Sequence, residues 1–210
     1  MTSAVSAVID RDPASWRRVS TIADLAWIFE PGVQVCSWQR AIDPRITAYL
    51  DGVAGLGTLQ VLETLKPGER ARLADLPVEQ GREHLIDDVA LLSTILADLL
   101  DCSAVGLRCT RVEHAMCPVW HVDRVPLRLL CTYGGPGTEW LDDQGVDHAE
   151  LKRPAIAEGA CRRAVAGELV LLKGALWQDN DGFGAIHRSP AIAAGEGRRT
   201  LLTLDPLWLG

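Results

Sequence analysis

The sequence has little positive charge and no long apolar stretch, and these two absences exclude several classes of protein. Its 210 residues contain 21 Lys and Arg against 28 Asp and Glu, which gives a net charge of −7. This is the wrong sign for a protein that coats nucleic acid, because such binding depends on neutralising phosphates. No uncharged apolar run approaches the roughly 18 residues that a membrane-spanning helix needs. We therefore expect neither nucleic acid nor a membrane among the partners.

The N-terminus also lacks the pattern of a secretory signal, since Met1 to Arg11 has no basic segment followed by an apolar one. We therefore expect a cytoplasmic protein whose six cysteines are reduced. Hydrophobic residues make up 48% and charged residues 23%, which is the composition of an ordinary folded protein. The length suits one large domain, because single cores grow to about 250 residues before they divide.

The first half of the chain has a helical pattern. From Asp12 to Leu100 apolar residues recur at helical spacing, and the clearest stretch, Leu85 to Leu100, predicts a helix of about four turns. Shorter helices are expected over residues 22–29 and 45–53. We therefore expect residues 1–101 to form a helical region.

After Asp101 the pattern changes to that of strands. Apolar and polar residues alternate over 127–133 and again over 198–205, and a short apolar run follows Gly167. Residues 102–210 are therefore expected to form a mostly antiparallel sheet or barrel. Together the two halves predict one compact α+β domain with the helices packed on the sheet.

The residues that could carry chemistry begin with His121 and Asp123. In an extended segment these two side chains project to the same face, because side chains alternate with period two. A second imidazole from a neighbouring strand, that of His187, would complete a set of two histidines and one carboxylate. Such a set suits Fe(II), with Mn(II), Co(II) or Zn(II) as substitutes, and leaves coordination positions open. The His-x-Asp tripeptide alone is weak evidence for a metal site, since a core histidine near a surface aspartate produces the same pattern.

The order of features around this tripeptide resembles the iron(II)- and 2-oxoglutarate-dependent oxygenases. After the His-x-Asp motif come an apolar strand, a glycine-rich turn, a strand entered by glycine, a second histidine and a basic residue that opens the last strand. The resemblance covers roughly Val105 to Asp205. It implies a C-terminal core folded as a double-stranded β-helix of jelly-roll or cupin type. It also implies that His121, Asp123 and His187 hold Fe(II), with 2-oxoglutarate as cosubstrate.

The same resemblance implies that an arginine of the last strand pairs with the distal carboxylate of 2-oxoglutarate, as a bidentate guanidinium can. Arg198 and Arg199 point to opposite faces of that strand, so only one of them can serve. Gly-x-Arg spacing favours Arg199, which we expect, whereas an Arg-x-Thr pattern favours Arg198. Tyr133 could donate a hydrogen bond to the cosubstrate, and a core tyrosine is an equal alternative.

Three longer blocks are similar to a narrower family. Residues 117–123 read CPVWHVD, residues 131–141 read CTYGGPGTEWL, and residues 187–190 read HRSP. By these blocks the chain is identified as a member of the bacterial domain-of-unknown-function family number 1826. Membership implies that the blocks form one site, and it implies no reaction.

The cysteines leave a second kind of metal site open. Cys109, His114, Cys117 and His121 are spaced closely enough for a thiolate–imidazole zinc site. Against it, His121 cannot easily serve two metals, and a buried Cys109 would pack as a small apolar residue. Cys117 could be an additional ligand, a redox-active thiol beside the metal, or a packed residue.

Three further side chains could support the site. Glu139 could hold a histidine ring by accepting its N–H, and Trp120 could line an apolar pocket. Arg188 could anchor an anionic substrate or brace Glu139 across the sheet, and the brace is the expected role.

These patterns favour a metal-dependent, oxygenase-like enzyme that uses Fe(II) and 2-oxoglutarate to hydroxylate an unidentified small molecule or protein. The main alternative is a non-catalytic zinc-binding or metal-homeostasis protein on the same fold, with Cys117 closing the coordination sphere. A cupin-type barrel that binds a sugar or a small acid without redox chemistry is a third hypothesis.

Overall fold

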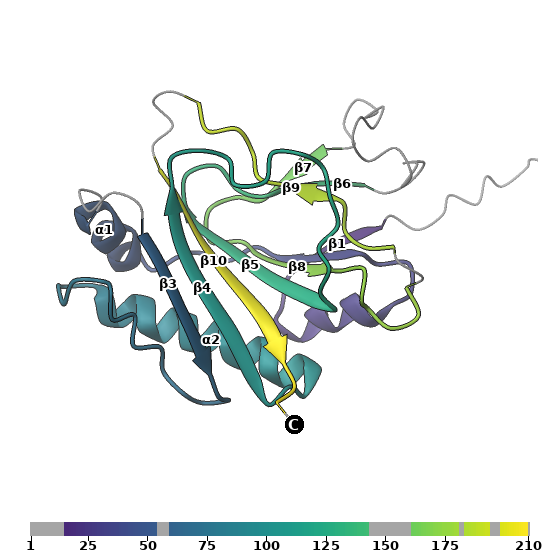
Figure 1. Ribbon diagram of the computed structural model, residues 1–210, viewed down its shortest axis with the longest axis horizontal. Helices are drawn as coiled ribbons and strands as arrows, with labels where there is room; N and C mark the ends of the chain where they lie inside the picture. The colour runs from purple at the N-terminus through teal and green to yellow at the C-terminus, as the bar shows by residue number, and fades with distance from the viewer. Residues whose placement is uncertain (1–14, 54–58, 143–160, 181–182, 194–197, 210) are drawn as a thin grey trace, which may run out of the picture.

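The structure, a computed structural model, has a layer of helices on one face of a large sheet and a smaller sheet over part of the other face (Figure 1). It describes residues 15–53, 59–142, 161–180, 183–193 and 198–209. The described part is mostly sheet, with few helices. None of the helices in these ranges is both long and apolar enough to span a membrane.

The elements follow in chain order as β1 (Trp16–Val19), η1 (a 3₁₀ helix, Ala23–Phe29), β2 (Val35–Trp38), α1 (Pro44–Gly52), β3 (Leu59–Leu65), α2 (Arg82–Leu100), β4 (Ala104–Val112), β5 (Leu127–Gly134), β6 (Glu139–Leu141), β7 (Cys161–Arg163), β8 (Leu169–Lys173), β9 (His187–Arg188) and β10 (Arg199–Leu207). The large sheet has the strand order β1-β2-β8-β5-β10-β4-β3, and the small sheet has the order β7-β6-β9. β1 and β2 pair in parallel, and the other described neighbours pair antiparallel, as the sequence predicts.

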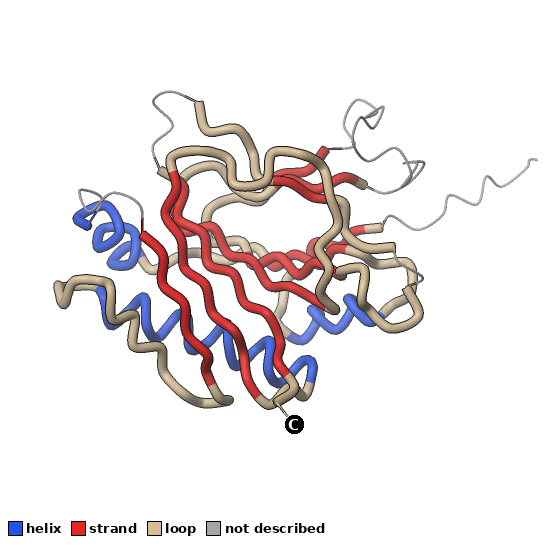
Figure 2. The backbone as a smooth tube through the Cα atoms, viewed as in Figure 1, coloured by secondary structure: helices blue, strands red, loops and turns tan. Residues whose placement is uncertain are grey.

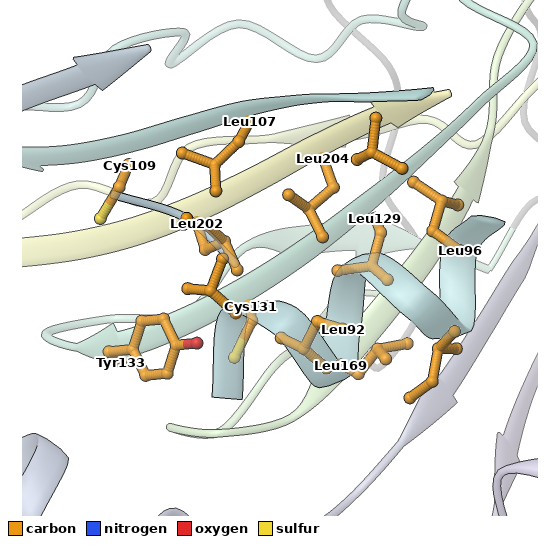
Figure 3. Packing of buried hydrophobic residues seen from close by; sticks show 14 of the residues in the cluster. Leu92, Leu96, Leu107, Cys109, Leu129, Cys131, Tyr133, Leu169, Leu202 and Leu204 are labelled. Atoms are coloured by element: carbon orange, nitrogen blue, oxygen red, sulfur yellow. The ribbon is translucent and has the colours of Figure 1, made fainter. Parts of the chain in front are cut away.

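The long helix expected over residues 85–100 is confirmed as α2, and its apolar stripe explains its position. Leu85, Val89, Leu92 and Leu96 recur at helical spacing and are all fully buried. Figure 3 shows Leu92 and Leu96 packed with leucines of the large sheet, among them Leu129. Burying one such side chain contributes about 1.5–3 kcal/mol. This cluster therefore holds the helical layer on the sheet.

The two shorter helices are also found, as η1 and α1, on the same side of the large sheet as α2 (Figure 2). α1 is capped by Asp43, the residue before it, whose carboxylate accepts the backbone N–H of Arg45 at 2.9 Å. Pro44 occupies the first turn, where its missing N–H costs no hydrogen bond. These local signals fix the start of the helix, which the sequence predicts over residues 45–53 and the structure has over Pro44–Gly52.

The expectation of a wholly helical N-terminal region is wrong. β1, β2 and β3 all precede residue 102, and β2 and β3 pair with β8 and β4 in the large sheet. β2 has no alternating pattern, because Val35, Cys36 and Ser37 are buried on both of its faces. In β3 the row that faces the helices is interrupted by Glu63, whose carboxylate accepts the backbone N–H of Leu73 at 2.6 Å. A charged residue in that row conceals the period of two.

The face of the large sheet away from the helices carries a second apolar cluster. Trp140 of β6 is fully buried there against Leu130 of β5, Val170 of β8 and Leu201 of β10. This contact packs the small sheet over the middle of the large one. The candidate metal ligands lie beside this contact, between the edge strand β9 and the strands β5 and β10.

Candidate metal centre and its cavity

Two backbone hydrogen bonds bring His121 and His187 together from distant parts of the chain. The N–H of each residue donates to the carbonyl oxygen of the other, at 3.0 Å in both directions. The centroids of the two imidazole rings are consequently 4.4 Å apart. Both Nε2 atoms face the carboxylate of Asp123, whose nearest oxygens are 3.6 Å from that of His121 and 3.2 Å from that of His187.

These three residues can hold a metal ion. One ligand atom from each lies within 4.8 Å of the other two. In the ranges that the structure describes, no other group of three or more His, Cys, Asp or Glu side chains meets this condition. The predicted His121, Asp123 and His187 are therefore assembled as one cluster.

Both imidazoles are oriented by a backbone carbonyl group two residues earlier. Nδ1 of His121 lies 2.8 Å from the oxygen of Val119, and Nδ1 of His187 lies 2.9 Å from the oxygen of Ala185. A carbonyl oxygen only accepts, so each Nδ1 carries a proton. In the neutral rings each Nε2 is then unprotonated and directs its lone pair at the cluster, which is the form that binds a metal.

The carboxylate of Asp123 is held in its ionised form. Burial by itself raises its pKa, but the hydrogen bond with His187 and the electrostatic effects of His187, Arg128 and His121 outweigh burial and hold the pKa well below its usual range. Arg128 of β5 donates to Oδ2 of Asp123 at 2.6 Å and forms a two-bond pair with Asp205, at 2.7 and 2.8 Å. Sequence reasoning missed Arg128, because its partners become neighbours only in the folded sheet.

The backbone that carries Asp123 is fixed by the segment that follows β8. The N–H groups of Gly174 and Ala175 donate to the carbonyl oxygens of Pro126 and Asp123, both at 2.9 Å. A Cβ at position 174 would lie 1.9 Å from the oxygen of Val125 and 2.7 Å from that of Asp123. Only glycine permits this approach.

Arg199 lies behind the polar wall of the same site and is almost fully buried. Its guanidinium donates to the hydroxyls of Ser189 at 3.0 Å and Thr138 at 2.7 Å, and both of these residues line the cavity. Its Nε has no hydrogen-bond partner among the described residues. Burial lowers its pKa to about 10, so the group stays charged at neutral pH.

Arg198 has a different environment. It points away from the cavity and forms an ion pair with Glu113, with 2.6 Å between Nη2 and Oε1. Of the two arginines that the sequence left open, only Arg199 therefore bonds to residues that line the cavity. Arg108 of β4 is a further cation that the sequence reasoning did not single out. It lines the cavity with no ion pair or side-chain hydrogen bond to the described part of the chain.

Tyr133 is placed away from the site. Its row on β5 faces the helices, together with Leu129 and Cys131, and its hydroxyl donates to Asp88 of α2 at 2.6 Å. Burial raises the pKa of this hydroxyl well above its ordinary value. Of the two roles that the sequence leaves open for Tyr133, the contact with a cosubstrate is therefore wrong, because the alternation of side chains along the strand turns the ring to the opposite face of the sheet.

Cys117 is exposed at the rim of the cavity and does not join the metal cluster. The alternative zinc set is not assembled either, since Cys109 is buried in the core and burial raises its pKa to about 12. His114 is exposed on the loop after β4. The structure thus brings Cys117 beside the three candidate ligands without placing it among them.

Glu139 acts as a brace rather than as a histidine partner. It accepts from Arg188 at 2.7 Å and from Arg163 at 2.5 Å, whereas the histidine N–H groups already bond to backbone carbonyls. The guanidinium of Arg188 also lies over the ring of Trp120, 4.2 Å from its centroid. Trp120 packs with Leu141 and Ile186 in a small cluster of its own instead of lining the cavity.

The cavity beside the cluster has a volume of about 250 Å³. Its walls combine polar and apolar side chains: Arg108, Met116, Cys117, His121, Asp123, Arg128, Leu130, Thr138, His187, Arg188, Ser189, Leu201 and Thr203. The size suits a small ligand, and the cluster stands at its edge with the two Nε2 atoms facing one carboxylate.

Comparison with known proteins gives one family and one fold. A sequence profile of the family described as "Protein of unknown function (DUF1826)" matches residues 20–205. Among curated proteins, none matches the chain. Solved structures do match it, at low sequence identity.

The dioxygenase for auxin oxidation 1 from Arabidopsis thaliana, in a complex with 2-oxoglutarate, aligns with 93% of this chain and 92% of its own, with a TM-score of 0.55 and 9% identity. The dioxygenase for auxin oxidation in rice aligns with 89% of this chain and 77% of its own, with a TM-score of 0.53 and 15% identity. A protein of Caulobacter crescentus assigned to the 2OG-Fe(II) oxygenase family aligns with 93% of this chain and 87% of its own, with a TM-score of 0.51 and 15% identity. At these identities the similarity shows the fold alone.

Proposed function

Because the chain belongs to the family described as "Protein of unknown function (DUF1826)", which names no reaction, we propose its function from the site itself. The proposed activity is that of an oxygenase dependent on Fe(II) and 2-oxoglutarate, which hydroxylates an unidentified small molecule or protein. One observation carries the proposal: a buried arginine without a carboxylate partner in the described chain bonds to two residues of the cavity that the cluster of two histidines and one aspartate also lines.

In this proposal the two sheets are the two walls of a double-stranded β-helix of jelly-roll or cupin type. The similarity in fold to the dioxygenases described above supports it. The core would then use β2 and β3 as well as the strands after residue 102, because both are hydrogen-bonded into the large sheet. The candidate ligands would stand at the open side of this core.

The donor set fits the metal. His121 and His187 would each present an unprotonated Nε2, and Asp123 would present an ionised carboxylate, a combination that suits Fe(II) and leaves positions open. Sites that only hold zinc are normally closed by a fourth protein ligand, and Cys117 stays outside the cluster. When bound, Fe(II) and 2-oxoglutarate supply the oxidising chemistry, while the protein supplies positioning and excludes water.

Arg199 would hold the distal carboxylate of 2-oxoglutarate. A buried guanidinium is costly unless an anion neutralises it, and its planar fork matches a carboxylate. Thr138 and Ser189, which already accept from Arg199, would fix the orientation of the fork toward the cavity. A bound dicarboxylate would thus complete an environment that the described chain leaves without a counter-ion.

The other side chains that line the cavity indicate the chemical class of the primary substrate. Met116, Leu130 and Leu201 offer apolar contact, and Arg108 offers a positive charge that no described carboxylate neutralises. We therefore propose that a screen for the substrate begins with small organic acids, whose anionic end Arg108 would bind.

The test is calorimetric titration of the Mn(II)-loaded protein with 2-oxoglutarate. Arg199→Gln should lower the affinity for 2-oxoglutarate by about tenfold or more, the loss expected from one charged hydrogen-bonded pair, and leave Mn(II) binding in place. Arg198→Gln, the neighbouring arginine on the other face, is the matched control and should bind 2-oxoglutarate like the wild type. Equal affinities in the two variants would refute the assignment of Arg199.

A different variant distinguishes the zinc-binding alternative from the oxygenase proposal. If Cys117 closed a zinc site, Cys117→Ser would lose metal. Under the proposal Cys117→Ser keeps the full metal stoichiometry, whereas Asp123→Ala loses it, and metal analysis after dialysis measures both.

A further inference from the structure

Lys173, the last residue of β8, is an unusually buried lysine. Its side chain is 1% exposed, and its ammonium donates to the backbone oxygen of Glu30 at 2.8 Å. The ammonium also lies 5.1 Å from the centroid of the Trp177 ring. In the described chain no ion pair joins Lys173 to a carboxylate. Lysine is almost never fully buried without such a partner, so this position needs an explanation.

A cavity of about 500 Å³ opens beside this ammonium. Its walls come from the end of η1, the end of α2, the residue before β5, the end of β8 with the segment that follows it, and the residue after β10: Phe29, Pro31, Leu100, Pro126, Lys173, Leu176, Trp177, Gln178, Asp179, Asn180 and Trp208. The rings of Phe29 and Trp177 are 5.7 Å apart, which makes one wall aromatic. The volume lies in the usual range of small-molecule sites.

Large apolar side chains are exposed around the mouth of this cavity. Leu176 and Trp208 are each 53% exposed, and Phe29 is 47% exposed. Exposed aromatic and aliphatic side chains that surround a concave surface are typical of a binding site. Asp179 is exposed and also lines this cavity.

The cavity is separate from the candidate metal centre. No described residue lines both. Lys173 shares its row on β8 with Leu169 and Leu171, which belong to the cluster under the helices, whereas the metal site lies on the other face of the sheet.

We propose that this second cavity binds a small organic acid with an apolar body, whose carboxylate pairs with Lys173 and whose body packs against Phe29, Trp177 and Trp208. Among the described residues that line it, Lys173 is the only Lys or Arg. Glu30 uses one of the three ammonium donors, so the others are available to an anion. A neutral ligand would leave the buried charge without a counter-ion, and a cation would be repelled.

The experiment compares an acid with its neutral analogue, decanoate with decanol, by calorimetric titration of the wild-type protein without added metal. Decanoate should bind more tightly than decanol. Lys173→Gln should lower the affinity for decanoate by about tenfold or more, as loss of one charged hydrogen bond does, and leave that for decanol nearly unchanged. Lys66→Gln, at an exposed lysine, is the matched control and should not differ from the wild type.

A second variant keeps the test decisive if Lys173→Gln unfolds. Trp208→Glu puts a negative charge at the exposed rim, where the fold tolerates it, and should weaken decanoate binding more than decanol binding. The proposal is overturned if the wild type binds neither compound, or if decanoate binds Lys173→Gln or Trp208→Glu as tightly as the wild type. No step depends on metal or 2-oxoglutarate, so the outcome is independent of the oxygenase proposal.

Discussion

Arg128 links Asp123 to Asp205 through a single guanidinium. It gives one hydrogen bond to the candidate metal ligand, at 2.6 Å, and two to Asp205, at 2.7 and 2.8 Å. Only 17% of its side chain is exposed, so these bonds form largely out of water. The orientation of Asp123 therefore depends on a residue that binds no metal itself.

Replacing Arg128 should affect both the fold and metal binding. Arg128→Met leaves two carboxylates without their partner, and removing one member of a buried ion pair costs about 3–5 kcal/mol of unfolding free energy. Metal affinity should fall about 10- to 100-fold, as for other partners that orient a ligand. Urea denaturation and metal titration measure the two effects. Arg124→Met, at an exposed neighbouring arginine, should change neither. Unchanged metal affinity in Arg128→Met would show that Asp123 does not need this partner.

Gly174→Ala tests the contact between β8 and the loop that carries Asp123. The added methyl group would meet backbone oxygens at 1.9 and 2.7 Å, so the loop must move. We expect a loss of about 1–3 kcal/mol of stability, typical of overpacking, together with weaker metal binding. Gly52→Ala is the control, because a Cβ there has no neighbour within 4 Å. If Gly174→Ala bound metal like the wild type, this contact would not position the ligand.

Replacing Arg199 should weaken the binding of 2-oxoglutarate without lowering the stability of the ligand-free protein. In the free protein its buried charge has no described carboxylate partner, so Arg199→Met removes a desolvated charge and should leave the melting temperature unchanged or raise it. The same variant should bind 2-oxoglutarate much more weakly. Thermal unfolding with and without 2-oxoglutarate separates the two effects, because ligand that binds the native state raises the melting temperature. A large loss of stability without ligand would instead make Arg199 a structural residue.

Binding of an organic acid beside Lys173 should depend on pH. Burial lowers the pKa of this ammonium to about 8, while the charge of Glu30 opposes the shift. An anion favours the protonated amine, so the pKa is higher in the complex than in the free protein. Affinity for decanoate should therefore be constant between about pH 6 and pH 7, where its carboxylate is ionised, and fall as pH rises above about 8. Decanol affinity should not change over this range, and a flat profile for decanoate would contradict the pairing.

The parts of the fold that could be predicted are those with local causes. α2 has an unbroken apolar stripe, and α1 has Ile46, Tyr49 and Leu50 at helical spacing, so the pattern within each segment is sufficient. β2 is buried on both faces, and β3 carries Glu63 in its inward row. Their strand character comes from pairing with distant strands, which no local pattern reveals.

The candidate site, like the fold, has parts that the sequence predicts and parts that it does not reveal. His121, Asp123 and His187 could be named from their motifs, and the structure brings them together. The carbonyl oxygens of Val119 and Ala185, which orient the two rings, carry no side-chain signal at all. For Tyr133 the sequence leaves two roles open, because one residue of strand register decides which face a ring occupies, and the structure places it in the core.

The most direct test of the central claim is to load the anaerobic protein with Fe(II) and titrate it with 2-oxoglutarate while the visible spectrum is recorded. The account predicts one Fe(II) per chain and a charge-transfer band that grows to saturation at one equivalent of 2-oxoglutarate. A protein that retains stoichiometric zinc, or that binds Fe(II) and shows no spectral response to 2-oxoglutarate, would contradict it.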